Sequence, residues 1–258
     1  MNLYSSSPLI VVGLFVGVLC CIEAGRRVGK KMQKQGQDPG KTGTGAVEAA
    51  VFALLGLLIA FTFSGAAARF DARRMQIVNE ANAIGTAYLR VDLLPADRQA
   101  EIRDLFRAYT DARLEVYRAV PDMENVRTQQ AKAASVQEKL WAKSVAACAL
   151  APSPAATTLM IPALNEVFDV ATLRTASADL HVPTIVILML VVVSLGCAML
   201  AGFDMSVSKQ RSVMHFFGFA FLIALVVFVI LDIEFPRLGF IRLDGFDRYL
   251  EAARAAMQ

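Results

Sequence analysis

Four long apolar segments without a charged residue constrain what this chain can fold into. They cover residues 8–22, 51–68, 182–203 and 213–231. The last three are each close to the ~20 residues that a helix needs to cross ~30 Å of hydrocarbon, and the first gains length from the uncharged residues after Leu3. The chain is also 56% hydrophobic, above the roughly 45–50% of soluble domains. We therefore predict an all-α membrane protein with four transmembrane helices.

The charged residues between these segments set the predicted domain boundaries. No basic residue precedes the first apolar segment, so it is interpreted as a retained helix and not as a signal peptide. Residues 1–68 form a first transmembrane pair whose linker, 23–44, is basic and predicted to be flexible because it is rich in Gly and Gln. Residues 69–181 form an extramembrane insert, 182–231 a second pair, and 232–258 an amphipathic tail.

The distribution of basic residues predicts an orientation in the cell (inner) membrane. The linker 23–44 and the short connection after residue 203 lie on the same side and together carry most of the Lys and Arg near the spans. The positive-inside rule places that side in the cytoplasm, and hence both termini and the insert outside it. The difference in basic charge between the two sides is incomplete, because the other end of the second span also carries Arg69, Arg73 and Arg74.

The insert is predicted to be helical. The absence of proline between Gly45 and Arg90 allows the second span to continue beyond the membrane until Pro95. Apolar residues spaced by three and four predict a second helix from about Ala96, and further helices cover 123–149 and 161–181. Residues 151–155 are predicted to form a turn.

Several function classes find no support in the sequence. The four cysteines and two histidines form no metal-ligand or disulfide pattern, and no nucleophile, phosphate-binding, zinc-protease or dinucleotide motif occurs. The net charge of +3 is small and spread along the chain, which does not favour nucleic acid as a partner. We expect no enzyme activity, no metal and no cofactor; the expected partners are the lipid bilayer, further copies of the chain and an inorganic ion.

Polar residues near the ends of the spans are the candidate sites. Each has two interpretations: a vestibule that meets ions, or ion pairs and hydrogen bonds that fix helix packing. For Glu80 and the two acids after the fourth span we favour packing, and Pro236 with Gly239 is interpreted as a turn. The polar set is Arg73, Arg74, Glu80, Asn82, Asn165, Arg174, Asp232 and Glu234. If the protein has a pore, the candidates for its lining or apolar gate are Phe52, Phe61 and Phe63 in the second span. The interpretation favoured for these three residues is that they face lipid or pack against other helices.

Three stretches resemble a bacterial bestrophin-like family of four-span membrane proteins. They contain Arg-Arg at 73–74 followed by Glu-Ala-Asn-Ala at 80–83, then "LNEVFDVATLRT" from Leu164, and Asp-x-Glu-Phe-Pro-x-x-Gly at 232–239. The resemblance implies a bestrophin-type channel: a pentamer that conducts anions through a pore lined by the second helix. It also implies a cytosolic insert, opposite to the orientation that the charges predict. The acidic calcium clasp of animal bestrophins is missing.

Two functions of different class are therefore open. The first is an oligomeric ion channel with the second helix around the pore. The second is a non-conducting sensor or interaction module that acts through the helical insert, whose acidic and basic residues balance.

Overall fold

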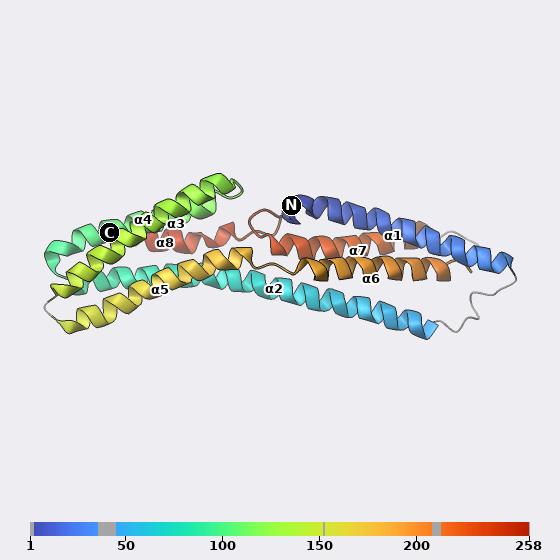
Figure 1. Cartoon of the computed structure of the whole chain (residues 1–258), viewed down its shortest axis with the longest axis horizontal. Coiled ribbons are helices and arrows are strands. Elements are labelled where there is room, and N and C mark those ends of the chain that lie inside the picture. Colours follow the sequence, from blue (N-terminus) through green and yellow to red (C-terminus); the bar gives the residue numbers. More distant parts are fainter. Residues whose placement is uncertain (1–2, 36–44, 152, 208–212, 258) are drawn as a thin grey trace. The chain divides into compact units, whose positions relative to one another are not determined.

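The computed structural model describes residues 3–35, 45–151, 153–207 and 213–257, and its regular elements there are helices (Figure 1). Four of the helices are long and apolar enough to cross a membrane, as predicted. The helices are α1 (Leu3–Lys34), α2 (Gly45–Leu89), the 3-10 helix η2 (Arg90–Leu93), α3 (Ala96–Arg118), α4 (Met123–Ala149), α5 (Pro154–Asp179), α6 (Thr184–Asp204), α7 (Val213–Glu234), the 3-10 helix η3 (Asp244–Phe246) and α8 (Arg248–Ala255).

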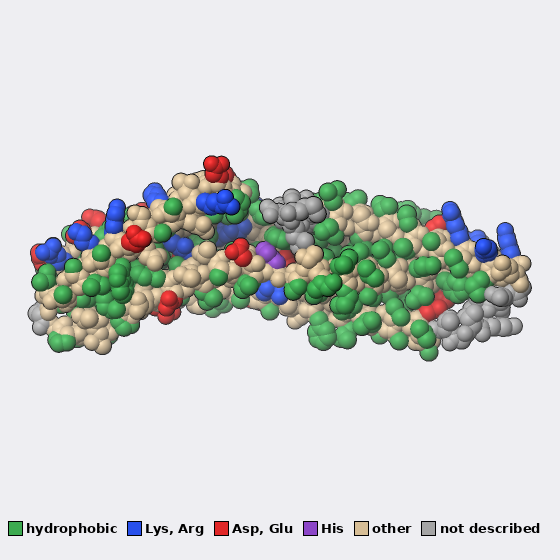
Figure 2. Space-filling model, viewed as in Figure 1, with side chains coloured by type: hydrophobic (Ala, Val, Ile, Leu, Met, Phe, Trp, Pro, Cys, Tyr) green, Lys and Arg blue, Asp and Glu red, His purple; other side chains and the backbone are tan. Residues whose placement is uncertain are grey.

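The chain forms two compact units. The membrane unit comprises Met1–Arg69 and His181–Phe235, and the insert unit comprises Phe70–Leu180 and Pro236–Gln258. In the membrane unit, α1 packs against both α6 and α7. Many hydrophobic side chains of these helices are exposed, and they cover much of the face of this unit seen in Figure 2. Such a surface is suited to lipid. In the insert unit, charged side chains gather over the surface instead (Figure 2).

Close helix contacts correct one prediction. The linker was expected to be flexible from residue 23, but α1 continues to Lys34. The continuation holds because Gly25 lies directly against the backbone of Met199 in α6, where a Cβ would overlap it, and Gly202 lies in the same way against Ile22. Glycine permits such approaches between membrane helices. The rest of the linker, 36–44, lies outside the described residues.

The insert unit has its own apolar core. The part of α2 beyond residue 69, η2, α3, α4, α5 and α8 surround buried Ile84, Phe106, Tyr109 and Leu164. The Tyr88 and Phe106 rings meet edge to face, with 6.0 Å between centroids. This core lets the insert fold by packing of its own helices.

Helix boundaries in the insert mostly follow the prediction. The long second helix reaches Leu89, and α3 and α4 occupy the predicted segments. The fourth helix begins earlier than predicted, at Pro154, because Ser153 caps it by accepting a hydrogen bond from the Ala155 amide at 3.3 Å. Proline is tolerated at a first helical turn, where its missing N–H is not needed. Asp232 was predicted to begin the tail, but it lies inside α7.

Candidate functional site

The membrane part of α2 presents one face to its own chain and leaves the opposite face exposed. Leu55, Thr62 and Ala66, spaced by seven and four residues, are buried. At about 100° per residue, the opposite side of the helix consists of Ala53, Leu57, Ala60, Ser64 and Ala68, all exposed. Small residues at this spacing allow close approach of another helix.

The three predicted pore phenylalanines do not share a face of α2. Phe52 is half-buried and its ring lies 6.2 Å from that of Phe219 in α7. Phe61 is 67% exposed and Phe63 is 42% exposed. Because Phe61 and Phe63 are two residues apart, they project about 160° apart around the helix. A single pore axis therefore cannot face both Phe61 and Phe63.

An ion pair joins α2 to the end of α7 within the membrane unit. Glu234 is 1% exposed and accepts a hydrogen bond from Nε of Arg69 at 2.9 Å. Its other oxygen accepts from the amide of Val182 at 3.4 Å and lies 3.5 Å from Nδ1 of His181. These contacts place Glu234 in a packed junction where α2, α6 and α7 meet.

Glu80 lies at the centre of the insert unit between two arginines. It is fully buried, and it accepts from Nε of Arg113 and from Nη1 of Arg174, each at 2.6 Å. Burial acts to raise the pKa of Glu80, but the two guanidiniums outweigh burial and hold this pKa below its ordinary value. Glu80 is therefore an anion shared by α3 and α5.

The cluster around Glu80 extends through Tyr117 to the C-terminal segment. The hydroxyl of Tyr117 accepts from Arg113 and donates to Glu80 at 3.4 Å, and the Arg174 guanidinium lies 3.4 Å from the centre of its ring. Burial, with the Glu80 charge, raises the pKa of Tyr117 to about 12, so its hydroxyl stays protonated. Asp247 accepts from Arg174 at 3.1 Å and from Arg237 at 2.8 Å. Every charged member thus has an opposite charge as partner, as a structural clamp requires.

The remaining predicted polar residues lie apart from this cluster. Arg73 is buried and donates to the carbonyl oxygens of Ser177 and Leu180, at 3.2 and 2.8 Å, so it caps the end of α5. Arg74 pairs with Asp71. Asn82 and Asn165 are exposed, and Asn165 does not take part in the cluster around Glu80.

The two predicted features after the fourth span also have defined places. Asp232 is buried in the last turn of α7, and its carbonyl oxygen accepts from the Phe235 amide at 3.2 Å. Pro236 and Gly239 lie in the turn that follows, which the Leu243 amide closes on the Pro236 carbonyl at 2.9 Å.

Arg113, Tyr117, Arg237 and Asp247 are cluster members that the sequence reasoning missed. A signal for Arg113 was present: it continues the apolar series Ile102, Phe106 and Tyr109 at spacings of four, three and four, so it occupies a core position. A charge at such a position requires a buried partner. Among the described residues, no group of three potential metal ligands occurs.

These features define a class: an all-α membrane protein with four spans, the second of which continues into a helical insert that has its own core. The sequence matches the family model described as the bestrophin-like domain over residues 12–244. The chain belongs to this family. A comparison with curated proteins finds no match.

Solved structures of a bacterial bestrophin homologue from Klebsiella pneumoniae, studied as point mutants, share the fold. One covers 96% of this chain and 98% of its own, with 15% identity and a TM-score of 0.70. A second covers 95% and 98%, with 16% identity and a TM-score of 0.67. At this identity the likeness concerns the fold alone.

Proposed function

We propose that this protein is an ion channel assembled from several copies, with α2 lining the pore. The observation that carries the proposal is the exposed face of α2, which is free of charges and consists mainly of small residues such as Ala53, Ala60 and Ser64. Lipid does not require small residues, whereas helix–helix contact favours them. A ring of α2 helices from several copies would use this face, as in channels of the bestrophin type.

Phe61 is the proposed apolar constriction. It is the most exposed of the three candidate phenylalanines, while Phe52 is packed against α7 and Phe63 projects to the side of α2 on which Phe52 lies. A large apolar side chain at a narrow point of a pore can exclude water and so block ions.

Purified protein in liposomes tests this proposal. We expect ion flux that scales with protein density, a larger flux for Phe61→Ala, and little change for Phe63→Ala, which removes the same side chain from another side of α2. Mass measurement in detergent should give a multiple of the chain mass. Vesicles that stay tight at all protein densities, or a monomer in lipid, would refute the channel and favour the non-conducting interaction module.

We propose further that the protein lies in the inner membrane with the basic side in the cytoplasm, as the positive-inside rule predicts. This orientation is supported by the lysines on the last turns of α1, which are Lys30, Lys31 and Lys34. A membrane-impermeant maleimide should then label Lys132→Cys, an exposed position on α4, in intact spheroplasts of cells that express an otherwise cysteine-free chain. Labelling only after lysis would establish the opposite orientation.

A further inference from the structure

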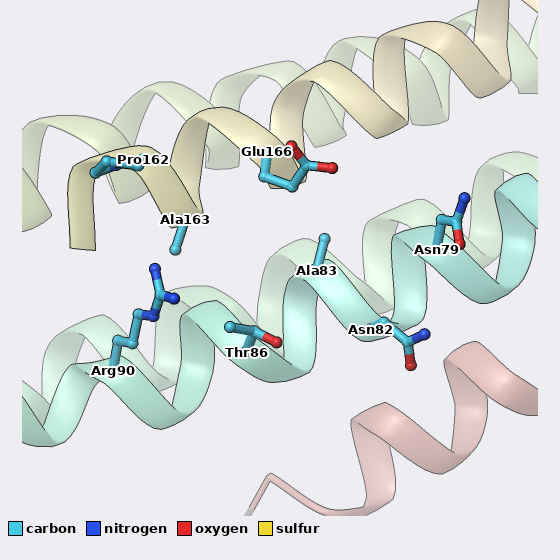
Figure 3. Close-up of a pocket in the computed structure, with 8 residues that line it drawn as sticks. All are labelled: Asn79, Asn82, Ala83, Thr86, Arg90, Pro162, Ala163 and Glu166. Atoms are coloured by element: carbon cyan, nitrogen blue, oxygen red, sulfur yellow. The ribbon is translucent and has the colours of Figure 1, made fainter. Parts of the chain in front are cut away.

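We propose that the cleft between α2 and α5 in the insert unit binds a small zwitterion with one carboxylate and one ammonium group, such as a free amino acid. The cleft has a volume of about 460 Å³, within the range of small-molecule sites. Figure 3 shows its two walls: Asn79, Asn82, Ala83 and Thr86 come from α2 and Arg90 from the start of η2, which follows it directly, and Pro162, Ala163 and Glu166 come from α5. This site is separate from the proposed pore.

Small residues on the facing helices create the space. Ala83 and Ala163 are the buried residues of the lining, and neither side chain is long enough to fill the gap between the two helices (Figure 3). On the first wall the lining residues recur at 79, 82, 83 and 86 in α2 and at 90 in η2, a spacing that follows one face of a helix over about 16 Å. The cleft therefore suits an elongated molecule of a few heavy atoms.

The walls are tied together at both ends. On one side of the cleft, Oγ of Ser177 donates to the side-chain oxygen of Gln76 at 2.5 Å, and Glu80 holds Arg174. At the other, Arg90 donates to the carbonyl oxygen of Leu159 at 2.5 Å. A site whose walls are already fixed loses less entropy when a ligand binds.

The polar groups of the lining have hydrogen-bonding capacity left for a ligand. Asn79, Asn82, Thr86 and Glu166 make no side-chain hydrogen bond or ion pair with any described residue. Arg90 uses only one of its N–H groups on Leu159, and a guanidinium has five. In Figure 3 the Arg90 guanidinium points toward Ala163, while the Glu166 carboxylate extends toward the Asn79 end.

This charge arrangement selects the ligand class. Arg90 and Glu166 are the two charged groups of the lining and have opposite sign, so a simple anion or cation would meet one partner and one repulsive charge. A molecule that carries both charges satisfies both, because its carboxylate meets Arg90 and its ammonium meets Glu166.

Calorimetric titration of the purified full chain with each standard L-amino acid tests the proposal. We expect at least one to bind, and we expect both its carboxamide and its N-acetyl derivative to bind at least ~10-fold more weakly, because each loses a charge-assisted hydrogen bond. Arg90→Gln should bind the acid and the carboxamide alike, and Glu166→Gln should bind the free and N-acetylated forms alike. Arg90→Lys, which keeps the charge, should retain the preference for the acid.

Asp169→Asn on α5 and Arg127→Gln on α4 are matched controls, since both positions are exposed and outside the cleft; they should bind as the unmodified chain does. The proposal fails if no amino acid binds, or if Arg90→Gln and Glu166→Gln retain full affinity and selectivity. It also fails if Thr86→Cys cross-links copies of the chain in membranes in full yield, because a neighbouring copy then fills the cleft. All readouts are independent of ion flux.

Discussion

Replacing Glu80 with Gln should strongly destabilise the insert unit. The substitution keeps the shape of the side chain but removes the anion that Arg113 and Arg174 contact, each at 2.6 Å. The side chains of both arginines are 7% exposed or less, so water cannot replace the lost carboxylate. Removing one partner from a buried ion pair costs about 3–5 kcal/mol.

The single tryptophan provides a selective assay. Trp141 lies in α4, and its ring is 6.3 Å from that of Phe168 in α5, so its fluorescence reports unfolding of the insert unit and not of the spans. A loss of 3 kcal/mol corresponds to a melting temperature at least ~6 °C lower for a protein of this size. The control is Asp111→Asn, which breaks the half-exposed pair with Arg254 and should cost at most ~1 kcal/mol.

The Glu80→Gln substitution should also change how the stability of the insert unit depends on pH. The pKa of Glu80 is lower in the folded protein than its ordinary value of 4.5, so its stabilisation is complete above that value. It declines as the pH falls from 4.5 through the folded pKa, because the unfolded chain then binds the proton more readily. Glu80→Gln should remove this part of the acid sensitivity. If the variant melts and titrates like Asp111→Asn, the account of Glu80 as a buried clamp is wrong.

Two further substitutions test the membrane unit by melting in detergent. Gly202→Ala should lower stability by about 1–3 kcal/mol through overlap with the α1 backbone, whereas Gly13→Ala, with no neighbouring atom within 4 Å, should be neutral; equal effects would contradict the close α1–α6 contact. Glu234→Gln should cost about 1–3 kcal/mol, less than a fully buried pair because its partner Arg69 is 32% exposed. Asp71→Asn, which breaks an exposed pair, should change the melting temperature little. If Asp71→Asn and Glu234→Gln lower the melting temperature equally, the contacts of Glu234 do not stabilise the membrane unit as proposed.

The sequence predicted the helices better than their partners. Charge-free length predicts a span, and the absence of proline from Gly45 to Arg90 predicts a continuous second helix, because both depend on local properties. The end of α1 was missed because it depends on glycine contacts with another helix. The pairing of Glu80 with Arg113 joins residues far apart in sequence, so no local pattern specifies it.

The buried charges of the insert nevertheless follow the periodicity of its apolar core. Glu80 takes its place in the buried series Arg73, Ile77, Glu80, Ile84 and Ala87 of α2, whose alternating spacings of four and three define a core-facing stripe. Apolar side chains alone would tolerate a slip of α2 by one turn, because Ile77, Ile84 and Ala87 would still meet a hydrophobic surface. Such a slip would move Glu80 by about 5.4 Å and leave it and both arginines buried without partners, at a cost of several kcal/mol. The ion pairs at Glu80 thus discriminate between registers that hydrophobic burial does not distinguish, and they fix the face of α2 that borders the cleft.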